Sequence, residues 1–524
     1  MVSKTKFPRA DHLPDHLPGR PSRTGRVARF AAAVPLILAM SCTGDPGTPA
    51  AARTAVVAAP GAETTVLDAP PGPGSAVATS AALFGSAPVV VVAAEADAAA
   101  SATAGVVAQE LGVPMLWTSG SGDEDVRREV ARLSPEAVLA VGADARRAAE
   151  EWGGVRVVGI DAASDGRTPD LPDELPAVDA PEPVGVTVVV DATRHDDAAV
   201  ATARAAGARV VAVDGHDPRA DPAAIDVLRA QPPAAVVAVG ADFGPAERLR
   251  ARVRTAVRAE QLPGGGQVVF PGRRLVCLYG HPGAPVLGVL GEQGVEASIE
   301  RAKRLAAEYA PFSDVPVVPT FEIIATVAHG SPGPDGDYSG EASVESLLPW
   351  VEQAGRAGLY VVLDLQPGRA RLVDQAQRYA PLLRLPHVGL AVDPEWKLGP
   401  DQVPLRQIGG VDAAEVNEVT AWLADLTARE SLPQKLVVVH QFTLSMIRDA
   451  PSLVTTRDEL AVLIHMDGQG STAQKTATWN SVVAARPGDD VPMGWKNFYD
   501  EDHPVLTPEQ TMTFEPRPSM ISYQ

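Results

Sequence analysis

The ten residues "HVGLAVDPEW", from His387 to Trp396, predict a buried strand that ends in charge. Its continuous apolar run is typical of a strand covered on both faces, as in a parallel sheet. Pro394 has no backbone N–H to donate, so strand pairing should stop there. Asp393 and Glu395 are two residues apart, and on an extended strand they would point to the same face. The stretch therefore predicts an α/β fold with two carboxylates at the carboxyl end of one strand.

The same pattern recurs from Arg274 to Gln524, a span of about 250 residues that suits one (β/α)8 barrel. Amphipathic, helix-like segments such as "VEASIERAKRLAAEYA" separate most of the apolar runs, which favours parallel strands. The predicted strands are "RLVCLYG", "VPVVPTFEIIATVA", "LYVVLDLQ", "VGLAVDPE", "KLVVVHQF", "LAVLIHMDG", "MGWKNFYD" and "SMISYQ". We expect a TIM-like barrel over residues 274–524. An open doubly wound sheet is the rival, and it fits polar residues at nearly every strand end less well.

Those polar strand ends predict a site, because barrels of this kind carry function at the carboxyl ends of their strands. Neighbouring carboxylates in a confined site raise one another's pKa, which can keep one protonated as a general acid. We expect Glu395 to be the catalytic acid/base and Asp393 to orient the substrate or assist as a nucleophile. The residues expected to bind substrate are His281, Glu322, Asp364, Gln366, Trp396, His440, Gln441, His465, Asp467, Lys496 and Tyr523. An isolated polar residue at a strand end also occurs as a helix cap, and that reading stays open for each of them.

The strand that carries the two carboxylates resembles the "DGxDxDxE" strand of chitinase-like glycoside hydrolases. Gly389, Asp393 and Glu395 match that pattern, whereas Val388 and Ala391 stand where it has its first two Asp residues. The resemblance implies that Glu395 is the general acid and that Asp393 orients the N-acetyl group of a sugar. We expect a polysaccharide as the partner and no cofactor.

A repeat occupies residues 86–260. The segment "SPEAVLAVGADARRAAE" (134–150) resembles "PPAAVVAVGADFGPAER" (232–248), and Val-rich runs precede each copy at matching positions. Each copy predicts alternating strands and helices with a parallel sheet. Gly264 to Gly266 mark a boundary between this region and the barrel. We therefore expect a repeated parallel α/β region followed by a (β/α)8 barrel.

The repeat resembles the putative cell-wall-binding repeat 2 of Gram-positive surface proteins. The segments "GVPMLWT" and "AVLAVGAD" match two of its strands, while the second copy, "GARVVAVD", lacks the Pro. The resemblance implies that residues 86–260 bind a cell-wall polysaccharide. A generic α/β domain for sugar- or nucleotide-type ligands remains the alternative.

The N-terminus predicts export. A basic lead is followed by "FAAAVPLILAM" (30–40) and then by Cys42, and the apolar run is too short to span a bilayer stably. Residues 1–42 resemble a bacterial lipoprotein signal peptide, which implies lipidation of Cys42; an ordinary signal peptide is the alternative. The Ala-, Pro- and Gly-rich residues 43–85 predict a disordered tether. We expect a lipid-anchored protein on the extracellular face of the membrane or in the cell wall.

Composition excludes several classes of function. The net charge of −20 opposes binding to nucleic acid. The chain has no Walker loop, GxGxxG or zinc-type Cys/His array, so we expect no cofactor and no metal.

The acidic loop "PDGDYSGE" lacks EF-hand spacing, and Cys277 is expected to be a buried apolar residue. The abundance of Ala and Val is typical of actinobacterial sequences.

Three functional hypotheses follow. The first is an exported, lipid-anchored cell-envelope protein whose barrel binds a glycan and hydrolyses it. The second is a non-catalytic cell-wall-binding lipoprotein with a degenerate hydrolase barrel, since a fold does not fix a function. The third is a solute-binding lipoprotein, which the long barrel-like C-terminus fits poorly. Whether the barrel is an enzyme stays open at this point.

Overall fold

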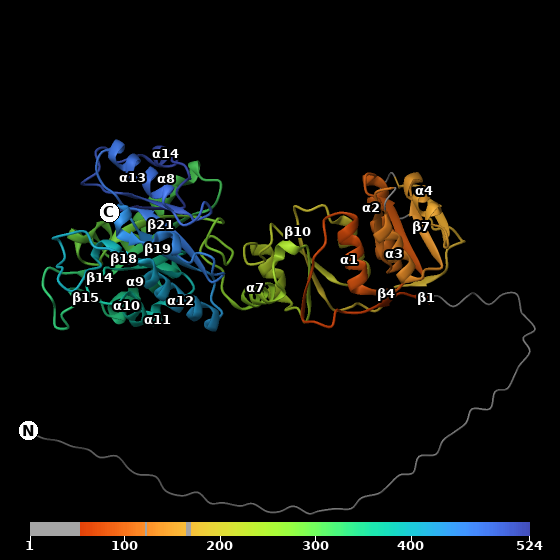
Figure 1. Ribbon diagram of the computed structural model, residues 1–524, viewed down its shortest axis with the longest axis horizontal. Helices are drawn as coiled ribbons and strands as arrows, with labels where there is room; N and C mark the ends of the chain where they lie inside the picture. Colours follow the sequence, from red (N-terminus) through yellow and green to blue (C-terminus); the bar gives the residue numbers. More distant parts are fainter. Residues whose placement is uncertain (1–52, 121–122, 164–168) are drawn as a thin grey trace, which may run out of the picture. The chain divides into compact units, whose positions relative to one another are not determined.

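The computed structural model describes residues 53–120, 123–163 and 169–524 (Figure 1). Cys42, the predicted signal peptide and the first residues of the predicted tether lie outside this part of the chain. Among the described residues, no helix combines the length and apolar character needed to cross a bilayer.

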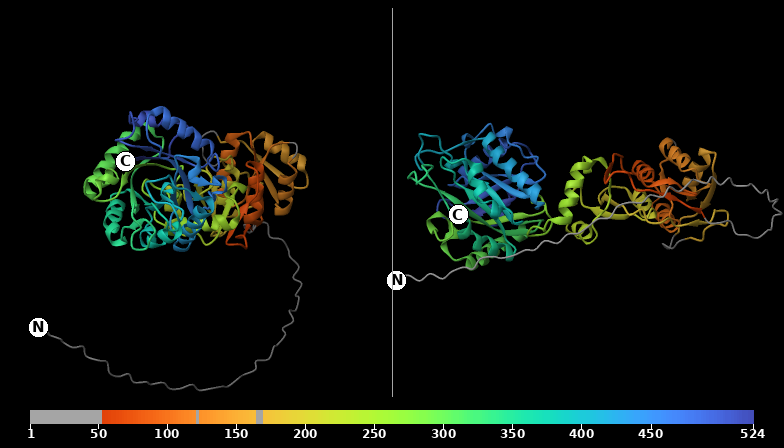
Figure 2. Two further views of the ribbon diagram at one scale, coloured as in Figure 1. Left: turned by 60° about the vertical axis from the view of Figure 1, so that its left-hand side comes forward. Right: turned by 90° about the horizontal axis from the view of Figure 1, so that it is seen from below.

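The C-terminal half is a closed barrel of parallel strands surrounded by helices (Figure 2). Its eight strands are β13 (Arg274–Gly280), β14 (Val317–Ala328), β16 (Tyr360–Leu365), β17 (Val388–Val392), β19 (Lys435–His440), β21 (Leu460–Met466), β22 (Met493–Asn497) and β23 (Met520–Tyr523). Each strand pairs with the next in chain order, and β13 pairs with both β14 and β23, which closes the circle. The predicted TIM-like barrel is confirmed. The short strand β15 (Ser339–Glu341) folds back antiparallel onto the end of β14.

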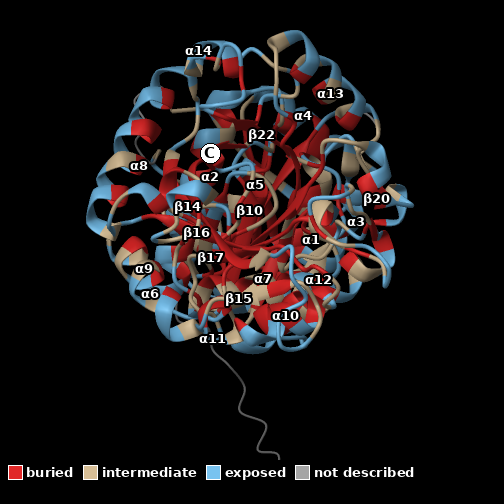
Figure 3. Ribbon diagram, turned by 90° about the vertical axis from the view of Figure 1, so that its left-hand side faces the viewer, coloured by how far each residue is buried: buried red, intermediate tan, exposed pale blue. Residues whose placement is uncertain are grey.

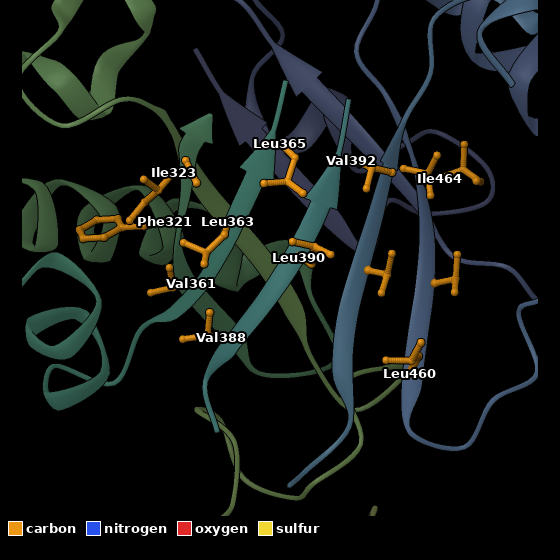
Figure 4. Close-up of a cluster of buried hydrophobic side chains, with 14 of the residues drawn as sticks. Phe321, Ile323, Val361, Leu363, Leu365, Val388, Leu390, Val392, Leu460 and Ile464 are labelled. Carbon is orange, nitrogen blue, oxygen red and sulfur yellow. The ribbon is translucent and has the colours of Figure 1, made fainter. Parts of the chain in front are cut away.

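Helices enclose this barrel, and their buried faces turn toward the strands (Figure 3). They are α8 (Val295–Tyr309), α9 (Val344–Arg356), α10 (Leu372–Arg378), α11 (Ala380–Leu383), α12 (Ala413–Glu430), α13 (Thr472–Ala484) and α14 (Pro508–Thr511). Apolar residues of the strands alternate between two environments, because successive side chains point to opposite faces. Those that point outward, among them Phe321, Leu363 and Leu390, form the core between strands and helices (Figure 4).

The inward-pointing side chains divide the barrel interior into an apolar half and a charged half. Near the amino ends of the strands the interior is filled by the cluster Leu275, Cys277, Val318, Tyr360, Val362, Ala391, Leu436, Val438, Leu463 and Met520. Cys277 is a buried free thiol, as expected. On the same strands, further toward the carboxyl ends, Glu322, Asp364 and His440 take the inward positions and are fully buried. The apolar filling therefore supports a floor of charged groups at the carboxyl end.

Two four-stranded parallel sheets form the region before the barrel, in the orders β6-β5-β7-β8 and β11-β10-β12-β3. The first uses β5 (Val89–Ala94), β6 (Met115–Thr118), β7 (Ala137–Val141) and β8 (Arg156–Ile160), with α2 (Ala98–Leu111), α3 (Glu124–Leu133) and α4 (Ala143–Trp152). The second uses β10 (Thr187–Asp191), β11 (Arg209–Val213) and β12 (Val236–Val239), with α5 (Asp197–Ala205), α6 (Pro222–Ala230) and α7 (Ala246–Arg258). The predicted two-copy parallel α/β architecture is confirmed.

The fourth strand of the second sheet corrects one prediction. Residues 53–85, which the composition assigned to a tether, include β3 (Thr64–Leu67) and the partly buried helix α1 (Pro73–Leu83). β3 pairs in parallel with β12, at the position that β8 occupies beside β7 in the first sheet. The second copy has no strand of its own after α7, so the segment upstream of the first copy fills that edge. The short strands β1 (Arg53–Thr54) and β2 (Val56–Val57) also lie in the predicted tether, and β4 (Phe84–Ser86) spans its boundary with the repeat region.

Candidate active site at the mouth of the barrel

A cavity of about 390 Å³ opens at the carboxyl end of the barrel strands. Its polar lining comes from Gln366, Asp393, Glu395, Asp467, Gln469, Lys496, Glu501 and Gln524. Its apolar and aromatic lining comes from Tyr279, Val286, Leu287, Ile324, Val327, Ala328, Trp396, Leu405, Phe442 and Phe498. The site therefore has the two kinds of surface, polar and aromatic, that a small polar ligand with a flat apolar face needs.

Asp393 and Glu395 both line this cavity, although not as residues of an extended strand. β17 ends at Val392, and residues 394–396 form a short 3-10 helix. Asp393 caps it, since the backbone N–H of Glu395 donates to Asp393 Oδ1 at 3.2 Å. The prediction of two carboxylates on one strand face is thus wrong in its geometry. The turn nevertheless brings both, together with Trp396, to the cavity wall.

The two carboxyl groups hold their protons unusually tightly. Asp393 is only 3% exposed, and burial raises its pKa well above the usual value. Glu395 is half-buried, and burial together with the negative charge of Asp467 raises its pKa to about 7. Near neutral pH, Glu395 is therefore divided between its two forms, and Asp393 keeps its proton to a higher pH than an ordinary aspartate does.

His440 lies at the centre of the charged floor, between two carboxylates. Its Nε2 is 2.9 Å from Glu322 Oε1, and its Nδ1 is 3.0 Å from Asp467 Oδ2. Burial opposes a charged imidazole, but the hydrogen bonds with Asp467 and Glu322 outweigh it and raise the pKa of His440 well above its usual value. Burial likewise opposes the two carboxylates, yet their bonds with His440 lower the pKa of both. The three groups form a buried carboxylate–imidazolium–carboxylate triad.

A second group of polar contacts surrounds Asp364. The hydroxyl of Tyr279 donates to Asp364 Oδ2 at 2.8 Å, and the Lys496 ammonium lies 3.6 Å above the centre of the Tyr279 ring. Burial raises the pKa of Asp364 to about 6 despite the attraction of His440. Gln366 is held by the backbone N–H of Ala328, which donates to its Oε1 at 3.0 Å. These contacts fix the floor of the cavity before any ligand arrives.

The structure gathers most of the predicted residues at this mouth. Those that line the cavity are Gln366, Asp393, Glu395, Trp396, Asp467 and Lys496, and those in the buried layer beneath it are Glu322, Asp364 and His440. His465 is also in that layer, where its Nε2 lies 2.6 Å from Ser522 Oγ and burial lowers its pKa to about 4. Gln441 is buried and its amide donates to the Thr443 carbonyl at 3.4 Å, so it supports a loop rather than the cavity wall.

Two predicted ligand-binding residues lie elsewhere. Tyr523 points to the outer face of the barrel, and its hydroxyl is 2.6 Å from that of Tyr309 on α8. The alternation of side chains explains this, because the neighbouring residue Ser522 takes the inward position. His281 turns back to the Ile324 carbonyl, 2.8 Å from its Nδ1, and lines a separate surface pocket with Trp350. Neither side chain is placed to touch a ligand in the cavity.

Several lining residues were missed by the sequence analysis, notably Tyr279, Phe442, Phe498 and Glu501. Tyr279 belongs to an apolar run, so its side chain is expected in the hydrophobic core. A signal existed, since it alternates with Cys277 and therefore shares the inward face. Phe498 likewise follows Lys496 by two residues. Counting alternate positions back from the strand ends would have found both.

One acidic group among the described residues has the spacing of a metal site. Oxygens of Asp335, Asp337 and Glu341, in the loop after β14 and in β15, lie within 4.8 Å of one another. Burial raises the pKa of Asp337, and the Asp335 carboxylate adds to this shift. These three residues could hold a cation, but acidic side chains alone do not identify one. The cavity lining itself has no comparable group among the residues described.

Comparison with known proteins assigns the chain to no family. No family model matches the chain, and no curated protein matches it. Among solved structures, the chain is similar to a xylanase and alpha-amylase inhibitor protein from Scadoxus multiflorus, with 14% sequence identity and a TM-score of 0.29 over 48% of this chain and 92% of that one. This similarity is too low to support any conclusion about activity.

Proposed function

We propose that the barrel hydrolyses a glycan by carboxylate acid/base catalysis and that Glu395 is the general acid. The observation that carries the proposal is the environment of Glu395, a half-buried carboxyl group at the cavity wall beside ionised Asp467. An acid whose pKa lies near the working pH is the best compromise between holding a proton and releasing it.

The neighbouring groups have complementary roles in this mechanism. Glu395 gives its proton to the glycosidic oxygen as the C–O bond breaks, and water then replaces the leaving group and returns a proton to the site. Asp467 stays ionised, so its carboxylate stabilises the positive charge that develops on the sugar ring. Burial raises the pKa of Asp393 and so disfavours its ionised form, which favours an orienting role over that of a nucleophile.

The rest of the lining supports a sugar as the ligand. Trp396 and Phe442 offer apolar faces on which the C–H face of a sugar can stack, while Gln366 and Lys496 offer hydrogen bonds to hydroxyl groups.

The proposal extends to the location of the protein. We infer export and lipidation at Cys42 from the N-terminal sequence, and attachment of residues 86–260 to a cell-wall polysaccharide from the resemblance of the repeat. Mass spectrometry of the membrane fraction tests the anchor, since Cys42→Ser should abolish an acyl-modified N-terminus. Release of an unmodified protein from wild-type cells would contradict it.

Hydrolysis is tested on purified protein with a panel of polysaccharides and muropeptides, by reducing-end release. Glu395→Gln should abolish release without unfolding the barrel, whereas Glu345→Gln, on the exposed face of α9, should leave it unchanged. Equal turnover by wild type and Glu395→Gln would contradict the role of Glu395. Binding without turnover by the wild type would favour the non-catalytic alternative.

A further inference from the structure

Apolar side chains stand exposed around the mouth of the candidate site. Six of the ten exposed large apolar residues in the described chain lie in connections that follow barrel strands, namely Val286, Leu405, Ile408, Leu444, Val454 and Tyr499. Tyr499 is in contact with Arg301 on α8, and Val454 lies on the chain close to the amino end of β21. The other four, which we call the apolar rim, come from the loops after β13, β17 and β19, and two of them, Val286 and Leu405, line the cavity. Single exposed apolar side chains are ordinary, but a cluster of them around a cavity marks a binding surface.

The two most exposed members of the rim line the cavity itself. Val286 is 89% exposed and Leu405 is 77% exposed. Both line the cavity that contains Glu395 and Asp467, although they follow β13 and β17, which are separated by two other strands. The rim is therefore continuous with the candidate active site.

Leu405 has an unusual backbone conformation. Its φ angle is +66°, in the left-handed region that bulky L-residues rarely adopt. Such a conformation costs free energy, and residues of this kind concentrate at functional sites. Leu405 therefore combines a strained backbone with an apolar side chain that is exposed to water. Packing within the fold explains neither feature.

The buried and the exposed parts of the cavity lining differ. The buried part includes Asp467 and Lys496 above the triad around His440, whereas the exposed part combines the polar Gln469 and Glu501 with the apolar Val286 and Leu405. A ligand whose polar groups reach the floor can therefore place apolar surface against Val286 and Leu405. Such a ligand is an amphiphile.

We propose that the substrate is an amphiphilic glycan, whose sugar enters the cavity while a covalently attached acyl, alkyl or prenyl chain lies across Val286, Leu405, Ile408 and Leu444. This assignment rests on the proposed function of the same site. Two copies of the chain are a poorer occupant, because a stable interface buries about 800 Å² and about 20–30 residues per partner, far more than four side chains provide. One hydrocarbon chain matches that smaller surface.

The test uses the full chain carrying Glu395→Gln, so that binding is measured without turnover. The probes are dodecyl maltoside below its micelle concentration and maltose, each titrated calorimetrically. Dodecyl maltoside should bind at least tenfold more tightly than maltose. Val286→Ser combined with Leu405→Ser should remove about tenfold or more of that affinity, because the double variant removes apolar surface that the alkyl chain would bury.

Val454→Ser is the matched control, because Val454 is 45% exposed and lies on the chain just before the amino end of β21. It should leave both affinities unchanged, and any binding of detergent to the apolar residues 30–40 is common to all variants. Equal binding of the two probes, or equal loss in Val454→Ser and the rim variant, would overturn the proposal. So would rim-dependent dimerisation in light scattering, or rim-dependent binding to phosphatidylglycerol vesicles without binding of monomeric dodecyl maltoside. Failure of hydrolysis alone would contradict the proposed function and leave these binding results intact.

Discussion

Replacing Glu395 with Gln should make the barrel more stable at pH 8 and leave its stability unchanged at pH 4. The folded protein holds the Glu395 proton with a pKa of about 7, against an ordinary value of 4.5. Since the folded-state pKa is the higher one, the favourable contribution is complete below about pH 4.5 and is lost as the pH rises through about 7. Ionised Glu395 is then a charge confined beside Asp467, which an amide avoids.

The size of this effect follows from the same two pKa values. Their difference corresponds to about 3 kcal/mol, an upper value because Glu395 is only half-buried and water screens part of its charge. We expect Glu395→Gln to gain about 2–3 kcal/mol relative to the wild type at pH 8. The gain should shrink through pH 6 and disappear near pH 4.

Urea unfolding at several pH values measures this difference. Tryptophan fluorescence suits the experiment, because five of the seven Trp residues, at positions 350, 396, 422, 479 and 495, belong to the barrel. Asp393→Asn is a useful comparison, since burial raises the pKa of Asp393 as well. A Glu395→Gln variant that is equally stabilised at pH 4 and pH 8, or destabilised at pH 8, would refute the reasoning.

Three further predictions concern the groups around the cavity. His440→Gln should lose about 3–5 kcal/mol in urea unfolding at pH 7, because it removes the charge that pairs with two buried carboxylates; a loss below 1 kcal/mol would contradict the triad. Tyr279→Phe removes the hydroxyl that donates to Asp364, so the pKa of Asp364 should rise above about 6 in a carbon-13 NMR titration; an unchanged or lower value would contradict that bond. Tyr523→Phe should cost only about 1 kcal/mol and leave ligand affinity unchanged, because the hydroxyl contacts Tyr309 outside the cavity; a weakened affinity would restore Tyr523 to the site.

The barrel was predictable because its strands are buried on both faces and therefore read as continuous apolar runs. Even β22, whose run is interrupted by Gly494 and Lys496, was recognisable from its place in the series. The tether was mispredicted for a related reason. A segment rich in Ala, Val and Thr has few bulky apolar side chains, so its sequence shows no clear core pattern. Residues 64–67 form a strand because they pair with the edge of the sheet beside β12, a contact that the local sequence does not reveal.

The site was predictable in its location and less so in its geometry. Carboxyl ends of parallel strands meet at one end of a barrel, so polar residues at those ends had to gather there. Alternate residues of a strand face inward, and the pairing register with the neighbouring strands decides which alternate set does so. This register places Tyr523 on the outer face of the barrel and Tyr279 on the inner face. The cap that Asp393 forms after β17 depends on the local turn at Pro394, which spacing on an extended strand does not represent.

A carbon-13 NMR titration of the Glu395 carboxyl group, assigned by its disappearance in Glu395→Gln, tests the central claim most directly. If Glu395 is the acid of this site, its signal should titrate with a midpoint of about 7. A midpoint near the ordinary value of 4.5 would mean that the carboxyl is ionised at neutral pH, and it would contradict the proposed role of Glu395 as general acid.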